Sequence, residues 1–241
     1  LISAGDSSNT IIDGGGISSV ITFTGLYPCY NTVIKGFGIT NGIQIAGSTS
    51  EDGAGILIKN VGPIISNCHI YLNAGTGIYT DGNSTLILKS NVSYNNVNFS
   101  NSSNGGGIDS RAEQVHIDSC IISYNQRGVV NEWGSGGGAA GISLRDGNSK
   151  ITNCTISNNK NIGANYYPGG GGITLNGNGH LVDNNIIIFN SGPKASAIFC
   201  AITGNTPTIK NNIIYGNSDN AAISSWNNSN PHLIGNTIAN N

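Results

Sequence analysis

Charged residues are scarce in this sequence, and several absences exclude whole classes of protein. Only 9% of the 241 residues are Asp, Glu, Lys or Arg, and the formal net charge is −2. No basic run occurs. Because binding to phosphate backbones needs clustered Lys and Arg, we expect no nucleic-acid partner. No apolar run approaches the length of about 18 residues that a membrane-spanning helix requires, so we expect no membrane span.

Methionine is absent altogether, even at position 1. We therefore expect the chain to be a processed product or a part of a longer chain. Glycine, in contrast, is abundant, with 36 residues. These glycines follow no period of three, which excludes a collagen-like chain.

A short apolar run recurs along the whole chain. Its copies are VIKGFGITN (33–41), IISNCHIYLN (64–73), LILKSNVSYN (86–95), HIDSCIISYN (116–125), ITNCTISNN (151–159), LVDNNIIIFN (181–190), TIKNNIIYGN (208–217) and LIGNTIANN (233–241). One aligned column through them reads Phe37, Cys68, Ser90, Cys120, Cys154, Asn185, Asn212, Asn236. Its period of roughly 28 residues is typical of a solenoid.

A glycine-led segment precedes each of these runs after the first. Its copies are GAGILIK (53–59), GTGIYTD (75–81), GGGIDSR (105–111), AAGISLR (139–145), GGGITLN (170–176), ASAIFCA (195–201) and NAAISSW (220–226). Alternate positions are apolar or small, as in Ile173 and Leu175, which is the period of a half-buried strand. No segment has the length or period of a helix. Coils of short strands stacked about 4.8 Å apart therefore predict an all-β fold of the β-helix type.

Asparagine recurs where the second apolar run bends, as at Asn184 and Asn185. Asparagine tolerates the left-handed backbone conformation that a tight bend needs. Stacked asparagine side chains also bond to one another between neighbouring strands, as in other cross-β ladders. We therefore predict an asparagine ladder along the solenoid.

The GGGITLN and ITNCTISNN units resemble right-handed parallel β-helix repeats of the pectate-lyase-like superfamily. They are also similar to repeats of bacterial and archaeal cell-surface β-helix proteins. The resemblance implies one right-handed parallel β-helix domain of about eight coils over residues 1–241, as part of a longer chain. It also implies an extracellular or cell-surface setting and a polysaccharide or cell-surface glycan as partner.

The cysteines and histidines do not form a recognisable metal or catalytic motif. Because in-register strands are too far apart for a relaxed disulfide, we expect free, buried thiols at Cys29, Cys68, Cys120, Cys154 and Cys200. We expect surface or turn positions for His69, His116, His180 and His232.

Charged residues gather on the outward side of the glycine-led strands in the middle coils. Alternation places two columns there: Leu57, Tyr79, Asp109, Ser143, Thr174, Phe199, Ser224 in the first, and Lys59, Asp81, Arg111, Arg145, Asn176, Ala201, Trp226 in the second. Asp81, Asp109, Arg111 and Arg145 come from three successive coils. Their Cα atoms should therefore lie within roughly 10 Å of one another, and we take these four as the candidate catalytic residues.

The loops that lead into these strands differ in length, and a short loop between longer ones predicts a notch above the charged residues. Rings stack on the apolar faces of sugars, and arginine binds carboxylates through two parallel hydrogen bonds. The site therefore suits a sugar polymer. The candidate substrate-binding residues are Tyr79, Glu132, Trp133, Tyr166 and Tyr167.

The resemblance places activity on this same outward face. It implies either a lyase, with Arg111 or Arg145 as base and Asp81 and Asp109 as calcium ligands, or a hydrolase that pairs Asp81 with Asp109 or Glu132. The chain departs from the polygalacturonase pattern, because its NGHL at 178–181 is only a fragment of one motif. Sugar binding without catalysis and an ordinary solvated sheet face stay open as alternatives.

A second class of function competes with carbohydrate binding. A β-helix exposes unpaired strand edges at its ends, and neither end of this sequence shows an amphipathic helix that would cap it. End-to-end self-association would give a filament. The alternative is therefore a non-enzymatic cell-surface, adhesive or filament-forming solenoid.

Overall fold

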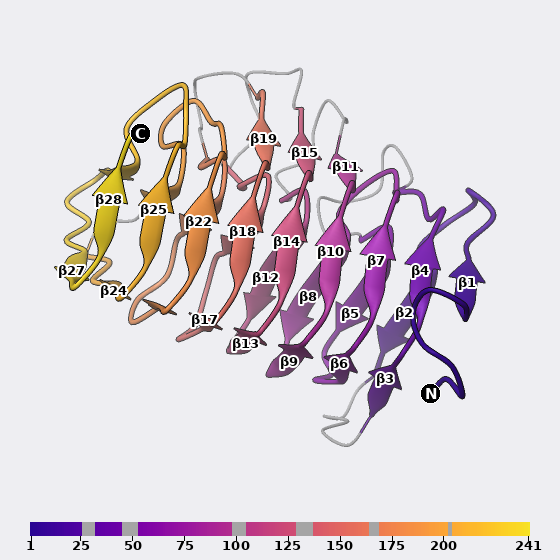
Figure 1. Cartoon of the computed structure of the whole chain (residues 1–241). Helices are drawn as coiled ribbons and strands as arrows, with labels where there is room; N and C mark the ends of the chain where they lie inside the picture. Colours follow the sequence, from indigo (N-terminus) through magenta and orange to yellow (C-terminus); the bar gives the residue numbers. More distant parts are fainter. Residues whose placement is uncertain (26–31, 45–52, 98–104, 129–136, 164–168, 202–203) are drawn as a thin grey trace.

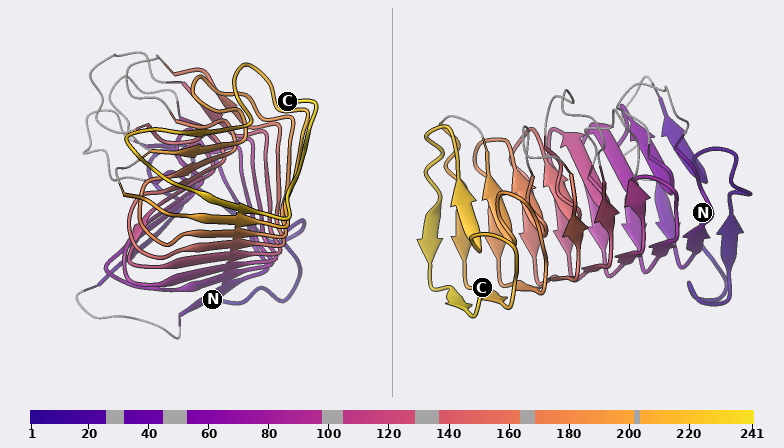
Figure 2. Two further views of the ribbon diagram at one scale, coloured as in Figure 1. Left: turned by 90° about the vertical axis from the view of Figure 1, so that its left-hand side faces the viewer. Right: turned by 90° about the horizontal axis from the view of Figure 1, so that it is seen from above.

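The computed structural model describes residues 1–25, 32–44, 53–97, 105–128, 137–163, 169–201 and 204–241. Within these residues every regular element is a short β-strand, and none is a helix. The strands pair in parallel with the equivalent strand of the next coil. Successive coils therefore stack along one axis, with the two termini at opposite ends (Figures 1 and 2).

The glycine-led segments form the first sheet. Its strands are β2 (Ile21–Thr24), β5 (Ile56–Lys59), β8 (Ile78–Gly82), β12 (Ile108–Ala112), β16 (Ile142–Leu144), β20 (Ile173–Leu175), β23 (Ile198–Cys200) and β26 (Ile223–Ser225). The predicted alternation is confirmed from β5 to β23, where both inward positions of each strand are buried. Ile173 and Leu175, for example, are both fully buried.

The two halves of each recurring apolar run form two further sheets. The second sheet contains β3 (Val33–Lys35), β6 (Ile64–Ser66), β9 (Thr85–Leu88), β13 (Val115–Asp118), β17 (Lys150–Thr152), β21 (Leu181–Asp183), β24 (Thr208–Lys210) and β27 (His232–Ile234). The third sheet contains β1 (Ile11–Asp13), β4 (Gly38–Thr40), β7 (His69–Tyr71), β10 (Asn91–Ser93), β14 (Ile121–Ser123), β18 (Thr155–Ser157), β22 (Ile186–Ile188), β25 (Ile213–Tyr215) and β28 (Thr237–Ala239). Isoleucines from all three sheets fill one continuous core.

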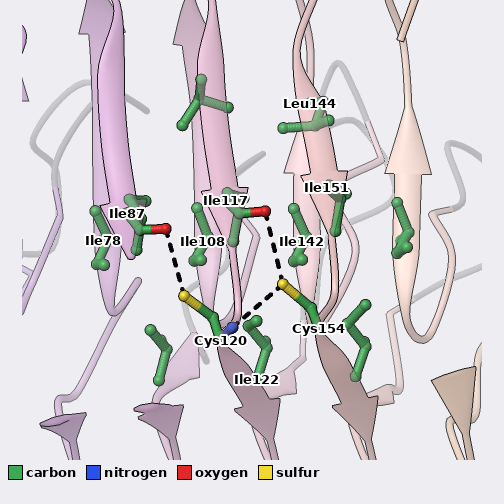
Figure 3. Close-up of a cluster of buried hydrophobic side chains, with 14 of the residues drawn as sticks. Ile78, Ile87, Ile108, Ile117, Cys120, Ile122, Ile142, Leu144, Ile151 and Cys154 are labelled. Carbon is green, nitrogen blue, oxygen red and sulfur yellow. Dashed lines mark hydrogen bonds between the residues drawn. The ribbon is translucent and has the colours of Figure 1, made fainter. Parts of the chain in front are cut away.

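The predicted side-chain column at the bend between the second and third sheets is confirmed as a hydrogen-bonded stack. The Cys120 amide donates to Cys154 Sγ at 3.4 Å, and the Cys154 amide donates to Asn185 Oδ1 at 2.9 Å. From Asn185 the stack continues as asparagine, with Nδ2–Oδ1 distances of 2.9 Å to Asn212 and from Asn212 to Asn236. Figure 3 shows the two thiols in this stack, beside the isoleucine core. Cysteine thus takes the place of asparagine in the middle coils.

A second asparagine ladder lies at the far end of the third sheet, and the sequence analysis did not identify it. Its members are Asn73, Asn95, Asn125, Asn159, Asn190, Asn217 and Asn241, and each Nδ2 donates to the next Oδ1 at 2.8–3.0 Å. Each Oδ1 also accepts the backbone N–H of the preceding member, as Asn125 does from Asn95 at 3.0 Å. These bonds satisfy both ends of the side-chain amide in the buried members of the ladder, from Asn73 to Asn217.

A small fourth sheet follows this ladder. It consists of β11 (Asn96–Val97), β15 (Gln126–Arg127) and β19 (Lys160–Asn161) and lies at the top of Figure 1, above β10, β14 and β18. Asn161 Nδ2 donates to the carbonyl of Gly138 at 3.1 Å, and Gly138 lies four residues before β16 begins at Ile142. This contact holds the small sheet against the entry to the first sheet, where the candidate residues lie.

Candidate functional site

The first predicted outward column is confirmed in register. Strand pairing aligns Leu57 with Tyr79, Tyr79 with Asp109 and Asp109 with Ser143, and the column continues through Thr174 and Phe199 to Ser224. Its middle members, however, have no exposed surface: Tyr79, Asp109, Ser143 and Thr174 are all 0% exposed. A solvated sheet face is therefore the wrong interpretation of this column.

Asp109 and Arg145 form a buried ion pair at the centre of the candidate site. Arg145 Nε donates to Asp109 Oδ1 at 2.8 Å, and Arg145 Nη2 donates to Oδ2 at 3.0 Å. The backbone N–H of Gly105 donates to Oδ2 at 3.0 Å. Burial is the largest single effect and lowers the pKa of Arg145, but the Asp109 carboxylate, with smaller contributions from Tyr79 and Asp146, raises this pKa above its usual value. Arg145 is therefore a poor general base.

Arg127 is a third charged member of this cluster. It lies on β15 of the small sheet and is 5% exposed. Burial, together with the positive charge of Arg145, lowers its pKa to about 10, although the Asp109 carboxylate partly offsets both effects. The sequence analysis did not place Arg127 here, because the strand pairing of the first sheet says nothing about the segment that packs on its outer side.

The polar members of the first column hold the chain that leads into their own strand. The Ala139 amide donates to Ser143 Oγ at 2.6 Å, and the Gly170 amide donates to Thr174 Oγ1 at 2.8 Å. Asp109 accepts from Gly105 in the same way, four residues earlier. These oxygen atoms satisfy backbone donors that would otherwise be buried without partners. The column therefore has a structural role in three successive coils.

The second predicted column is also confirmed in register, with Lys59 beside Asp81 and Asp81 beside Arg111. These three side chains are half-buried, and each has an electrostatic or hydrogen-bonding partner. Arg145 continues the column but is bonded to Asp109 of the first column. The structure therefore brings all four candidate catalytic residues into one neighbourhood, and at least two of them are bonded to each other.

The residues do not fit a calcium site at Asp81 and Asp109. Both oxygens of Asp109 bind Arg145, and Asp81 lies in register between two cationic residues, Lys59 and Arg111. Calcium prefers six to eight oxygen ligands with several carboxylates. In the described parts of the chain, no group of three or more His, Cys, Asp or Glu residues is arranged to hold a metal ion.

The substrate-binding candidates have different positions. Tyr79 is fully buried in the first column. Glu132, Trp133, Tyr166 and Tyr167 lie outside the described residues, so substrate binding by these four stays a prediction.

An open groove lies at the turns between the first and second sheets. We call it the turn groove. Its volume is about 550 Å³, and it is lined by Glu113, Asp146, Gly147, Asn148, Asn176, Gly177 and Asn178. Neither carboxylate was among the candidates from sequence. Glu113 follows Arg111 by two residues and Asp146 follows Arg145 by one, so the same alignment of coils would have placed both acids beside the charged column.

The prediction of buried free thiols is confirmed for Cys68, Cys120, Cys154 and Cys200, whereas Cys29 lies outside the described residues. Of the two predicted settings for His180, surface or turn, the structure shows the turn: His180 directly precedes β21 but is fully buried. Its Nδ1 accepts the Ser149 amide at 3.2 Å, and its Nε2 has no hydrogen-bond partner among the described residues. Leu181 begins strand β21 directly after it, so the ring is drawn inward with the start of the strand.

Acid should destabilise the fold through His180. Burial lowers its pKa from 6.5 to about 4, so the unfolded chain binds a proton at a higher pH than the folded chain. This stabilisation is complete above about pH 6.5 and is lost toward pH 4, by up to about 3 kcal/mol. Urea unfolding across this range should show a shallower pH dependence in His180→Gln than in the wild type. The exposed His232 supplies the control His232→Gln, and equal slopes in all three proteins would contradict the prediction.

The part of the chain that the structure describes contains no helix long and apolar enough to cross a membrane.

Comparison with known proteins gives a family but no individual relative. The family model described as the right handed beta helix region matches residues 2–179 and 140–241, which together cover nearly the whole chain. No curated protein and no solved structure matches the chain. The parallel sheets and the stacked coils agree with this match, so the chain belongs to the right-handed β-helix family.

Proposed function

We propose that the protein binds a neutral, hydroxyl-rich polysaccharide in the turn groove, outside the cell or at its surface. The observation that carries this proposal is the lining of the groove: two carboxylates and three asparagine amides around about 550 Å³ of open space. Carboxylates accept hydrogen bonds from hydroxyl groups, and amides both donate and accept them. This mixture suits a ligand whose surface consists mainly of hydroxyl groups.

The direction of the groove favours an extended ligand. Glu113 follows β12, Asp146 to Asn148 follow β16, and Asn176 to Asn178 follow β20, so the lining comes from three successive coils. Three coils span about 10 Å along the solenoid axis. A polymer strand that lies along this axis meets one set of polar side chains in each coil.

The charges favour a neutral sugar over a uronate. Glu113 and Asp146 would repel a carboxylate on the ligand. The guanidinium group of Arg145, which could otherwise bind a uronate through two hydrogen bonds, is bonded to Asp109. Recognition of an acidic polysaccharide therefore has less support than recognition of a neutral one.

Glycoside hydrolysis is the second candidate function, and one observation favours it. Glu113 and Asp146 belong to adjacent coils and line the same groove. Paired carboxylates are what acid–base cleavage of a glycosidic bond needs. In this alternative, one acid protonates the leaving oxygen, and the other activates water or attacks the sugar.

Affinity electrophoresis tests binding directly. The protein is run through gels that contain neutral or acidic polysaccharides, beside the double variant Glu113→Gln/Asp146→Asn. We expect neutral polymers to retard the wild type and the double variant to lose at least about tenfold in affinity, because two charge-assisted acceptors are removed. Release of reducing ends would establish hydrolysis in addition.

The matched control is Asp6→Asn/Asp13→Asn, which removes two carboxylate charges from the first coil, where both groups are exposed. It should bind like the wild type. Retardation of the Glu113→Gln/Asp146→Asn variant equal to that of the wild type would overturn the turn groove as the binding site. No retardation by any polymer would instead support the non-enzymatic structural solenoid.

A further inference from the structure

The outward face of the third sheet is uncharged from β4 to β28, whereas β1 at the N-terminal edge carries the exposed Asp13. We define this third-sheet face as strands β4, β7, β10, β14, β18, β22, β25 and β28 together with the residue after each. It contains no Lys, Arg, Asp or Glu, although the second sheet carries Lys35, Asp118, Lys150, Asp183 and Lys210. Figure 1 looks onto this face.

Large apolar side chains stand half-exposed along the third-sheet face. Eight of them are 41–62% exposed: Leu72, Tyr94, Ile121, Tyr124, Ile186, Phe189, Ile213 and Tyr215. The rings of Tyr94 and Tyr124 stack with centroids 5.0 Å apart, and Phe189 meets Tyr215 edge-on at 6.1 Å. The eight side chains form two clusters of four, one over β7, β10 and β14 and one over β22 and β25, with the polar residues of β18 between them. Exposed apolar clusters of this kind mark interaction sites.

The backbone at one edge of this face gives a second, independent indication. The residue after each strand has a positive φ, and four coils place Asn41, Asn158, Gly216 or Asn240 there. Four other coils place Leu72, Tyr94, Tyr124 or Phe189 in the same conformation, with φ of 52–56°. Such a conformation costs roughly 1–2 kcal/mol for a bulky residue. Asparagine would adopt this conformation with less strain. The apolar side chains must therefore make a favourable interaction that offsets the extra strain and that asparagine cannot make.

Ring stacking within one chain offsets only part of this backbone strain. An aromatic pair is worth about 0.5–1.5 kcal/mol, and the Tyr94–Tyr124 pair involves two strained residues. Leu72 lies at the same strained position and is 62% exposed, so it has little packing of its own to offset the strain.

We infer that the third-sheet face is the contact surface for a second copy of this chain, lying side by side with the first. Eight half-exposed large side chains offer roughly 100 Å² each, or about 800 Å² per copy. That area equals the contribution of one partner to an interface of standard size. Enrichment in tyrosine and depletion of charge are also typical of interface cores.

The absence of charge favours a second copy over other partners. A face that meets its own copy brings identical charges together, and like charges across an interface cost several kcal/mol. The third-sheet face avoids this penalty. Its columns run along the solenoid axis, so a two-fold axis that lies in the plane of the face can place apolar columns against apolar columns. This lateral contact differs from end-to-end stacking, which would leave the face exposed.

Sedimentation equilibrium and small-angle X-ray scattering test the inference. We expect the wild type to form a concentration-dependent dimer whose maximum dimension is close to that of one solenoid. Ile121→Lys, which places a charge in the contact, should weaken dimerisation at least about tenfold. Leu86→Lys is the matched control, because Leu86 is an exposed leucine on the second sheet, and it should dimerise like the wild type.

Tyr124→Asn distinguishes a loss of dimer contact from a loss of folding. Asparagine occupies the same position with the same φ in other coils, so this variant should keep its fold, as followed by circular dichroism, and should still dimerise more weakly. A wild type that is monomeric at every concentration would overturn the inference. A dimer about twice as long as one solenoid would also overturn it. So would an unchanged dimerisation constant in Ile121→Lys, or a monomer that binds neutral glycan through this face.

Discussion

Replacing Asp109 with alanine should lower the free energy of unfolding by about 3–5 kcal/mol, the range found when one partner of a buried ion pair is removed. Asp109 is fully buried and accepts two hydrogen bonds from Arg145 and one from Gly105. Its removal leaves Arg145 without its carboxylate and close to the positive charge of Arg127. Urea denaturation at neutral pH measures the loss.

Asp81→Ala is the matched control. Asp81 is an aspartate of the neighbouring coil in the same sheet, but it is half-buried, and exposed or partly exposed ion pairs contribute about 1 kcal/mol or less. The double variant Asp109→Leu/Arg145→Met should recover much of the stability, because no uncompensated charge is left at either position. A loss in Asp109→Ala no larger than in Asp81→Ala would contradict the structural role of the pair.

Replacing Asn125 with alanine should lower the free energy of unfolding by about 3–5 kcal/mol as well, because several buried groups lose their partners at once. Its Nδ2 donates to Val92 O at 2.8 Å and to Asn159 Oδ1 at 3.0 Å. Its Oδ1 accepts the backbone amide and the side-chain Nδ2 of Asn95, both at 3.0 Å. Denaturation by urea, followed by circular dichroism, measures the change.

Asn241→Ala is the control for this second prediction. Asn241 is the last member of the same ladder and is exposed, so water can replace its hydrogen bonds. We expect a loss of about 1 kcal/mol or less there. Equal losses at Asn125 and Asn241 would show that the contribution of a ladder asparagine to stability does not depend on its burial.

The fold could be predicted from the sequence because the same pattern of alternating apolar residues recurs in every coil. Ile173 and Leu175 point inward for the same reason as the aligned residues in the neighbouring coils. A wrong strand assignment in one coil would therefore disagree with the alignment of the other coils. The two outward columns were predicted in the correct register on the same grounds. Parallel pairing then places Asp109, Arg111 and Arg145 together.

The environment of those columns could not be predicted. The alternation of apolar and polar residues predicts which side of a strand a side chain occupies. It does not predict whether another segment of the chain covers that side. Arg127 approaches from the small sheet, which has strands of only two residues. Two residues are too few to show a period, so the burial of Asp109 had no signal in the sequence.

Two other features escaped for different reasons. The turn groove is built from residues just beyond the strands, and the predicted columns ended with the glycine-led segments at Arg111 and Arg145, one or two residues before Glu113 and Asp146. The longer asparagine ladder did carry a signal, because the recurring runs end in asparagine at Asn73, Asn125 and Asn190. The predicted ladder was the shorter one at the bend, which contains Asn185.

The central claim is that the Asp109–Arg145 pair holds the fold and that the turn groove binds the ligand. Thermal unfolding and affinity electrophoresis on the same two variants test it most directly, with binding measured well below the unfolding temperature. We predict that Asp109→Asn lowers the unfolding temperature and keeps its affinity for neutral polysaccharide, whereas Glu113→Gln/Asp146→Asn keeps the unfolding temperature and loses affinity. A stable Asp109→Asn variant that no longer binds, beside a groove variant that still does, would contradict the claim and return the site to the first sheet.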